Sequence, residues 1–420
     1  MSIENAERPA WRTFLTCIIH IRCMFDGIGS IDTVNTVESP NEIAYGMGAA
    51  AEITEFAADR NVDSALVVTD EVVLDAGAVD PVFAALEAAD VEVSTYDGVQ
   101  PEPKIEIALE AAELLRSVDA DIVVGVGGGS SLDTTKFASV LAEHDESPRE
   151  MLGMGNVPGP GRPTVLLPTT AGTGSEVSHI GVFADSDDGG IKKVVYSEHL
   201  FADLALVDPE LTRTMPPGVA AATGMDALSH AVECYVSTLR TPYTDTLARQ
   251  AIETIGSSLR PAVHQGEHND RARYRMSLAA TTAGQAFVNS GLGAVHALTY
   301  PLGIEHGVGH GLANAVLLPH VVRYNAPAEP ERFADVARLL EGTDDDGRST
   351  IDRAYDAAEA IEDLNEDIGI SNRIRDLGDI DRSEFETFAD IAFEHSKHNI
   401  DRNPRNLSPE DAIGIYEDGF

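Results

Sequence analysis

The chain has 420 residues, of which 43% are hydrophobic, and its 70 acidic residues outnumber its 29 basic residues to give a net charge of -41. This length and apolar content suffice for two domains with buried cores, and they argue against a disordered acidic protein. The charge argues against a nucleic-acid partner, because phosphate would be repelled, and it favours a salt-rich cytoplasm in which counter-ions screen the carboxylates.

The N-terminal segment differs from the rest of the chain. Residues 1–23 are slightly basic and contain two of the three cysteines, and Met24 offers an alternative start. Their short apolar stretch, Phe14–Ile21, is not followed by the cleavage site of a secretory signal. We therefore expect residues 1–35 to be a weakly ordered extension without a catalytic role, with a small extra structural element as the alternative.

From about residue 40 the sequence alternates between helical and strand-like segments. Two segments have helical character: Ala49–Asp59 and Ile105–Ser117. Four apolar segments bounded by turn residues predict strands: Ser64–Asp70, Val91–Tyr96, Ala120–Val126 and Pro163–Pro168. Strands that alternate with helices are typical of a parallel sheet covered by helices on both faces.

The pattern changes after Asp208-Pro209, beyond which the chain is mostly helical in period and has few strand-like segments. The domain boundary is therefore expected near residues 209–216. We predict an extension over residues 1–35, an α/β domain over residues 36–212 and an all-helical domain over residues 213–420. Three cysteines cannot form a disulfide framework, and no apolar run approaches the about 18 residues that a membrane helix needs, so we expect a cytoplasmic protein without membrane contact.

Two loops rich in small residues follow predicted strands. The first, Gly127-Gly-Gly-Ser-Ser-Leu-Asp133, precedes a helix, where backbone amides and the helix dipole favour a pyrophosphate. Its spacing differs from the usual dinucleotide fingerprint, and a tight turn with a serine N-cap is an equally good interpretation. The second loop is Thr169-Thr-Ala-Gly-Thr-Gly-Ser175. Together the two loops could form one extended anion cradle.

Asp70 ends the strand-like segment that begins at Ser64. An acid at such a place can accept hydrogen bonds from the adenosine ribose and repel a 2′-phosphate. A turn or N-cap aspartate is the simpler interpretation of this residue taken alone. Only the presence of the glycine-rich loop elsewhere in the sequence favours a role in binding the cofactor.

Candidate metal ligands lie in the helical half of the chain. Asp226 and His230 are four residues apart, which puts both side chains on one face of a helix. His296 and His310 follow in glycine-rich, apolar surroundings. One carboxylate with three imidazoles suits Fe²⁺ or Zn²⁺ and leaves a position open for substrate.

These segments together resemble the iron-containing alcohol dehydrogenases. The resemblance covers about residues 36–420 and rests on blocks in matching order: Gly127–Lys136, Pro168–Ser178, Met215–His230, His296–His310 and Asn403–Arg405. It implies a Rossmann-like α/β N-terminal domain, an all-helical C-terminal domain and a dinucleotide in the cleft between them. It also implies hydride transfer between NAD(H) and a small alcohol, aldehyde or ketone, and a homodimer or larger homo-oligomer.

The resemblance assigns roles to individual residues. It implies four metal ligands, which are Asp226, His230, His296 and His310, with Fe²⁺ as the expected ion and Zn²⁺ as the alternative. It implies that Asp70 favours NAD over NADP. It implies a set of further residues along the cofactor: Gly127, Gly128, Gly129, Ser130, Asp133, Thr169, Thr170, Thr173 and Lys193.

One departure from the family pattern concerns the proton route. Tyr300 stands where many members have a second histidine that is thought to aid proton transfer, so we consider Tyr300 and His306 as candidates for the relay. A plain loop histidine near the cleft is the simpler interpretation of His306. The alternatives for the whole chain are a hydroxyacid–oxoacid transhydrogenase or hydroxy-acid dehydrogenase, a metal-free maleylacetate reductase, or an idle NAD-binding protein. The complete ligand set argues against the last two.

Overall fold

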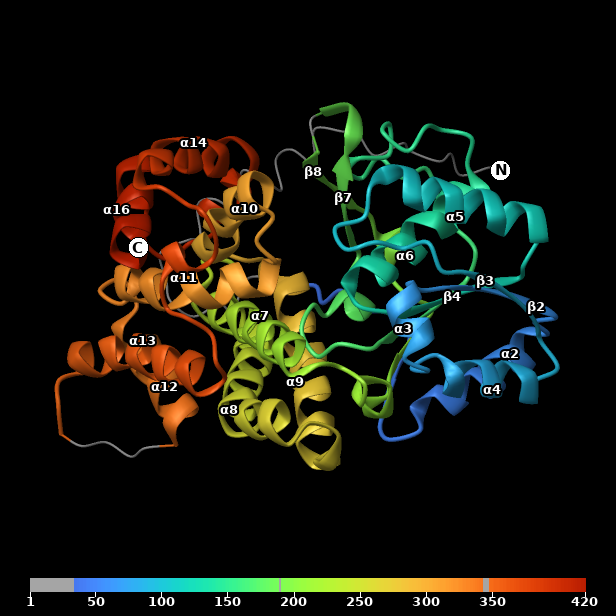
Figure 1. Ribbon diagram of the computed structural model, residues 1–420, viewed down its shortest axis with the longest axis horizontal. Coiled ribbons are helices and arrows are strands. Elements are labelled where there is room, and N and C mark those ends of the chain that lie inside the picture. The colour runs from blue at the N-terminus through green and yellow to red at the C-terminus, as the bar shows by residue number, and fades with distance from the viewer. Residues whose placement is uncertain (1–33, 189, 343–346) are drawn as a thin grey trace, which may run out of the picture.

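The computed structural model describes residues 34–188, 190–342 and 347–420 (Figure 1). The predicted extension therefore lies outside the described residues, apart from its last two positions. Within the described part of the chain, no helix is both long and apolar enough to cross a bilayer.

The N-terminal half is built on a six-stranded parallel sheet. Its spatial order is β1 (Ile43–Tyr45), β9 (Leu204–Val207), β6 (Thr164–Pro168), β4 (Ile122–Gly127), β2 (Ser64–Val68) and β3 (Glu92–Tyr96). All residues of β4, β6 and β9 are buried, as expected for strands covered on both faces. The four predicted strands are thereby confirmed, with shifts of one or two residues at their ends.

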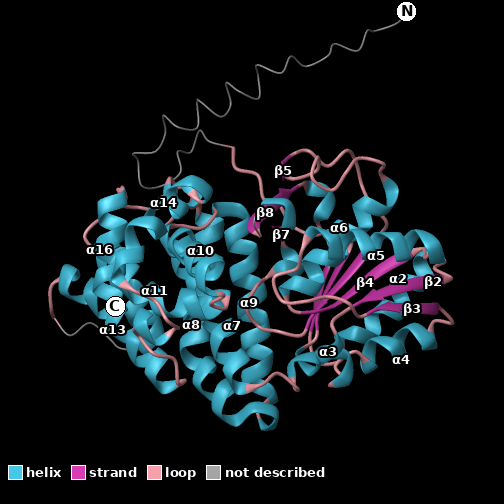
Figure 2. Ribbon diagram, turned by 45° about the horizontal axis from the view of Figure 1, so that its top comes forward, coloured by secondary structure: helices cyan, strands magenta, loops and turns pink. Residues whose placement is uncertain are grey.

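Helices cover both faces of this sheet (Figures 1 and 2). One face carries α2 (Ile53–Arg60) and α4 (Asp80–Ala88), and the other carries α5 (Ile105–Val118) and α6 (Gly129–Glu143). The pleat explains the division of the core, because Val67 packs with the first pair while Leu66 and Val68 pack on the α5 side. A short helix, α3 (Glu71–Asp75), follows β2.

A smaller three-stranded sheet was not predicted from the sequence. Its order is β5 (Gly153–Met154), β8 (Ile191–Tyr196) and β7 (Ile180–Asp185), with β7 and β8 forming an antiparallel hairpin. This hairpin lies between the large sheet and the helical half of the molecule (Figure 1).

The C-terminal half is helical, which confirms the predicted fold class. Its elements are α7 (Pro217–Val236), α8 (Pro242–Gln265), α9 (Asp270–Ser290), α10 (Ala294–His306), α11 (His310–Asn325), α12 (Pro330–Glu341), α13 (Thr350–Asp367), α14 (Phe385–His395), α15 (Lys397–Ile400) and α16 (Pro409–Gly419). Helix α7 lies at the centre and is buried without interruption from Gly224 to Val236. Asp226, His230 and Glu233 within that buried stretch therefore need partners.

Candidate metal and cofactor site

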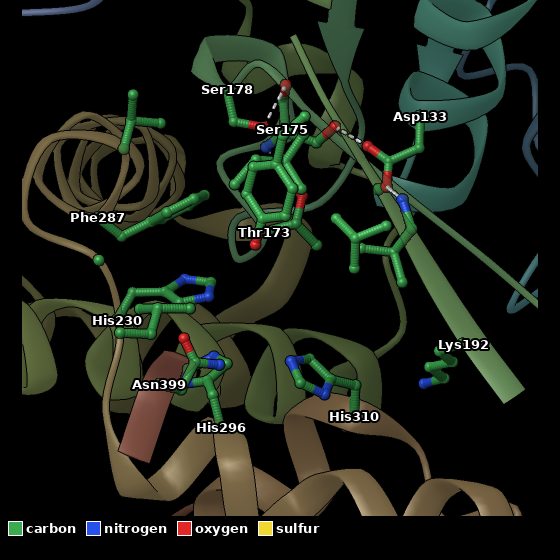
Figure 3. A pocket seen from close by; sticks show the side chains of 18 of the residues that line it. Asp133, Thr173, Ser175, Ser178, Lys192, His230, Phe287, His296, His310 and Asn399 are labelled. Atoms are coloured by element: carbon green, nitrogen blue, oxygen red, sulfur yellow. Dashed lines mark hydrogen bonds between the residues drawn. The ribbon is translucent and has the colours of Figure 1, made fainter. Parts of the chain in front are cut away.

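A cleft of about 470 Å³ separates the two halves of the molecule. One wall comes from the N-terminal end of α6 and from the loop that follows β6 (Figure 3). The other wall comes from α7, α9, α10 and α11. Among the predicted site residues, those that line it are Gly129, Ser130, Asp133, Thr173, Asp226, His230, His296, Tyr300 and His310.

The four predicted metal ligands converge at one wall of this cleft. The Oδ1 atom of Asp226 lies 3.8 Å from Nε2 of His230, 3.9 Å from Nε2 of His296 and 3.7 Å from Nε2 of His310. Four atoms bound tetrahedrally at about 2.1 Å to one ion would lie about 3.4 Å apart. The separations from Asp226 are slightly wider. Ligand atoms of Asp226, His296 and His310 all lie within 4.8 Å of one another, and His230 lies next to Asp226 but outside this mutually close group.

Burial and neighbouring charges shift the pKa values of the four candidate ligands in different directions. Burial raises the pKa of Asp226, but the charges of the surrounding histidines outweigh it, and the net pKa is lowered. Burial lowers the pKa of His230 to about 4. It also lowers the pKa of His310, whose side chain stays 45% exposed to the cleft. Burial lowers the pKa of His296 too, but the charges of Glu233 and Asp226 outweigh it, and the net pKa is raised. His230 and His310 therefore present lone pairs without competing protons, whereas His296 would release a proton on binding a metal.

Glu233 orients one of these ligands and was missed in the sequence analysis. It lies one turn after His230 on α7, and its side chain is 5% exposed. One carboxylate oxygen accepts a hydrogen bond from Nδ1 of His296 at 2.5 Å, and the other accepts one from the backbone amide of Val295 at 2.5 Å. The bond to Nδ1 places the proton there and leaves Nε2 of His296 free to face Asp226.

Asn314 completes the surroundings of the site and was also missed. It lies one turn after His310 on α11 and is fully buried. Its Nδ2 atom lies 2.7 Å from Oδ1 of Asp226 and 3.2 Å from Nε2 of both His296 and His310, while its Oδ1 has no partner. Lone pairs of Asp226, His296 and His310 therefore converge close to the Asn314 side chain, whose buried oxygen has no hydrogen-bond partner. A cation at the point of convergence would interact with these lone pairs.

The opposite wall carries the two predicted small-residue loops. Neighbouring strands β4 and β6 run parallel, so the loops that follow them meet at the same sheet edge. A Cβ atom added to Gly129 would lie 3.0 Å from the Thr173 side chain, and one added to Gly128 would lie 3.6 Å from Thr170. The two loops thus form one surface, as the sequence suggested.

The start of α6 is open to an anion. Its N-cap is Gly128, and no side chain caps the helix, so the alternative of a serine N-cap is not realised. The first amides of the helix remain available to a phosphate group. Gly127 has a φ of 154°, and a Cβ there would lie 2.6 Å from that of Ser131, so only glycine fits this turn.

Buried polar groups hold the second loop against α6. Asp133 accepts a hydrogen bond from the Ser175 hydroxyl at 2.6 Å and pairs with Lys136 at 2.9 Å. The Lys136 ammonium has no exposure and also donates to the backbone carbonyl of Ser175 at 3.1 Å. Asp133 and Lys136 therefore position the Thr169–Ser175 loop.

Asp70 caps α3 and lies beside the glycine-rich loop. One oxygen caps α3 by accepting from the Val73 amide at 2.9 Å, which confirms the N-cap. The other oxygen lies 3.4 Å from the Ser131 hydroxyl, beside the glycine-rich loop. Its position at the carboxyl end of β2 suits a ribose contact, and that role stays a prediction.

Comparison with known proteins supports this arrangement. The model described as iron-containing alcohol dehydrogenase matches residues 40–209, and the model for the C-terminal part of that family matches residues 220–420. The chain belongs to the iron-containing alcohol dehydrogenase family. Its membership confirms the predicted metal-dependent, NAD-linked oxidoreductase of alcohols and aldehydes.

Individual relatives match over nearly the whole chain. The sulfoacetaldehyde reductase of Bilophila wadsworthia is 37% identical over 90% of this chain and 97% of its own length. The 1,3-propanediol dehydrogenase of Klebsiella pneumoniae is 39% identical over 91% of this chain and 97% of its own length. The solved structure of the sulfoacetaldehyde reductase of Bifidobacterium kashiwanohense in complex with NAD+ has a TM-score of 0.82 and 31% identity, and it covers 92% of this chain and 98% of its own.

Two further predicted residues of this alcohol dehydrogenase, Lys193 and His306, do not line the cleft. Lys193 pairs with Asp188 at 2.6 Å and does not line the cleft, whereas its neighbour Lys192 does, because successive residues of β8 face opposite sides. His306 pairs with Glu384 at 2.9 Å at the end of α10, away from the cleft lining. Neither residue contacts the metal ligands.

Tyr300 lines the cleft one turn after His296, as predicted. Its hydroxyl donates to the backbone carbonyl of Lys192 at 2.6 Å, which joins α10 to the β7–β8 hairpin across the cleft. Burial raises the pKa of Tyr300 to about 12. The hydroxyl therefore holds its proton in this bond, and its role as a proton relay stays a prediction.

Proposed function

We propose that this chain interconverts a small alcohol and its aldehyde or ketone by hydride transfer to and from NAD(H), with iron as its resident metal. The convergence of Asp226, His230 and His296 with His310 on the cleft wall opposite an uncapped helix N-terminus carries this proposal. When bound, the metal supplies Lewis acidity and NAD accepts or returns the hydride. Zinc is the alternative ion, because the same donors bind it.

The protein's own residues then have distinct tasks. Asp226 and the histidines hold the ion, and Glu233 fixes the orientation of His296. The start of α6 and the Thr169–Ser175 loop receive the pyrophosphate, and Asp70 selects against a 2′-phosphate. The relay that carries the proton to solvent involves Tyr300 in this proposal, with exchange through a water or a ribose hydroxyl, and His306 is a weaker candidate because it faces Glu384.

We also propose where and how the enzyme works. The charge of -41 suits a salt-rich cytoplasm, and we expect a homodimer or larger homo-oligomer. A second candidate for the substrate is a hydroxy acid or another acid-bearing alcohol. The Bilophila relative is named for an aldehyde that bears a sulfonate. The side chain of Arg402, which lines the present cleft, favours the same kind of substrate.

The experiment that tests the proposal is a substrate panel at high salt. Short alcohols, diols and hydroxy acids are offered with NAD to protein of measured metal content. NADH formation with at least one of them, lost on chelation and restored by Fe²⁺ or Zn²⁺, is expected. Full turnover by protein shown to be metal-free would refute the metal's role, and the absence of turnover with every substrate would refute the activity.

A further inference from the structure

Arg402 brings a positive charge into the cleft that no described side chain neutralises. The residue follows α15 and lines the same cleft as His230 and His296. Within residues 34–188, 190–342 and 347–420, its guanidinium has neither an ion pair nor a hydrogen bond. Arg149 and Arg162, by contrast, each contact two or more carboxylates.

The Arg402 side chain is held in a defined place. It lies against Gly291, where an added Cβ would come within 2.5 Å of a guanidinium nitrogen, and the φ of 70° at Gly291 also favours glycine. The carbonyl of Gly291 faces Cys234, one turn of α7 beyond His230. The guanidinium therefore lies beside the helix that carries two metal ligands.

The acidic side chains of the cleft do not pair with Arg402. Asp133 pairs with Lys136, and Glu102 pairs with Lys192 at 2.7 Å. Glu38 lies 3.8 Å from Nδ1 of His179. None of these carboxylates lies within 4.0 Å of the Arg402 guanidinium. The charge is thus available to a ligand.

Other groups near Arg402 favour a small polar ligand. Asn399 lines the cleft with the metal-site histidines (Figure 3), and its side-chain amide makes no hydrogen bond within the described residues. Phe287 and Leu292 add apolar surface to the lining of the same cleft. Burial and the charge of Arg402 together lower the pKa of His398, which leaves that imidazole neutral and able to donate or accept a hydrogen bond.

We infer that Arg402 binds an anionic group at the far end of the substrate, so that the enzyme prefers short hydroxy or oxo compounds ending in a carboxylate or sulfonate to neutral alcohols. This inference rests on the proposed function, since it concerns the substrate of the same site. A planar guanidinium forms paired hydrogen bonds with either oxyanion. The surrounding charge of -41 repels anions, so recognition of one requires a local cation.

Matched substrates test this inference on the full-length, metal-loaded enzyme at one fixed salt concentration. 3-Hydroxypropanoate and 1,3-propanediol differ only in the far group, and 2-hydroxyethanesulfonate and ethylene glycol form the sulfonate pair. We expect a higher kcat/KM for the acid of at least one pair, and the pair that shows it identifies the anion. Arg402→Gln should lower the acid-to-diol ratio by about 10- to 100-fold, the usual effect of a charge-assisted hydrogen bond.

Two variants serve as controls. Arg402→Lys keeps the charge and should restore part of the ratio. Arg60→Gln removes an arginine that lies over Phe56 on the distant surface of α2, and it should leave the ratio unchanged. Equal wild-type efficiency for both members of each pair would overturn the inference while leaving the proposed function intact. An equal loss for acid and diol in Arg402→Gln would also overturn it, since that pattern indicates a structural role.

A binding measurement separates the inference from the proposed function. Titration calorimetry with propanoate and ethanesulfonate reports on the Arg402 site whether or not any alcohol is oxidised. Wild-type binding that weakens by about tenfold or more in Arg402→Gln supports the inference even if turnover fails with every substrate. Absence of wild-type binding to both anions would overturn it.

Discussion

Replacing Glu233 should weaken metal binding without removing a metal ligand. The carboxylate makes two buried hydrogen bonds of 2.5 Å, one of which orients His296. Loss of such an outer contact usually lowers metal affinity by about 10- to 100-fold, which corresponds to about 1.4–2.7 kcal/mol. We therefore expect the metal dissociation constant of Glu233→Ala to rise by that factor. Glu233→Gln keeps one acceptor oxygen for either Val295 or His296, so this variant should lose less metal affinity than Glu233→Ala.

The assay is a titration of metal-free protein with Co²⁺, followed by visible absorption in competition with a chelator of known affinity. Glu87→Ala is the matched control, because Glu87 is exposed on α4 of the other domain. Circular dichroism establishes that each variant is folded. An unchanged dissociation constant in folded Glu233→Ala would show that packing alone orients His296, and the reasoning would be refuted.

Three further predictions concern cofactor, salt and pH. Asp70→Gly should shift the preference of the enzyme toward NADP(H), and equal wild-type kcat/KM with both cofactors would contradict this role. Because the charge is -41, the melting temperature should fall when the salt concentration is lowered so that the Debye length rises from about 3 Å to about 10 Å. An unchanged melting temperature would contradict the predicted dependence on salt. Burial and the charge of Lys136 lower the pKa of His179 to about 4, so folding stability should be lost as the pH falls from about 6.5 toward that value. Urea unfolding of His179→Gln at several pH values should show a flatter dependence, and an identical slope would exclude His179 as the cause.

The sequence was most informative where function depends on local spacing. Asp226 and His230 share a helix face because they are four residues apart, and the structure places them 3.8 Å apart through Oδ1 and Nε2. The two loops could be paired because parallel strands end at one sheet edge. These features follow from helix and strand periodicity alone. The inclusion of His296 and His310 with that pair rested on residue types and their surroundings, and the family resemblance then implied the same four ligands.

Features that depend on tertiary partners were not predictable in this way. Glu233 lies on the ligand face of α7, but its partner His296 lies 63 residues away, so no local pattern indicates the bond. The β7–β8 hairpin was missed because a glycine interrupts the apolar residues of β7 and two lysines interrupt those of β8. The choice between Lys192 and Lys193 depends on the register of that hairpin, since one residue of shift exchanges the two faces.

The Tyr300–Lys192 hydrogen bond described above suggests that binding of the ion and the nucleotide can be uncoupled from turnover. All four candidate metal ligands belong to the helical half, and the two small-residue loops belong to the other half. Each half can therefore assemble its own ligand site, while the distance between the two sites depends on contacts across the cleft such as this one. Damage at the contact would yield protein that binds ion and nucleotide normally yet reacts slowly, because the reacting carbons are misaligned. Binding data alone would not reveal such a defect, and pre-steady-state hydride transfer would.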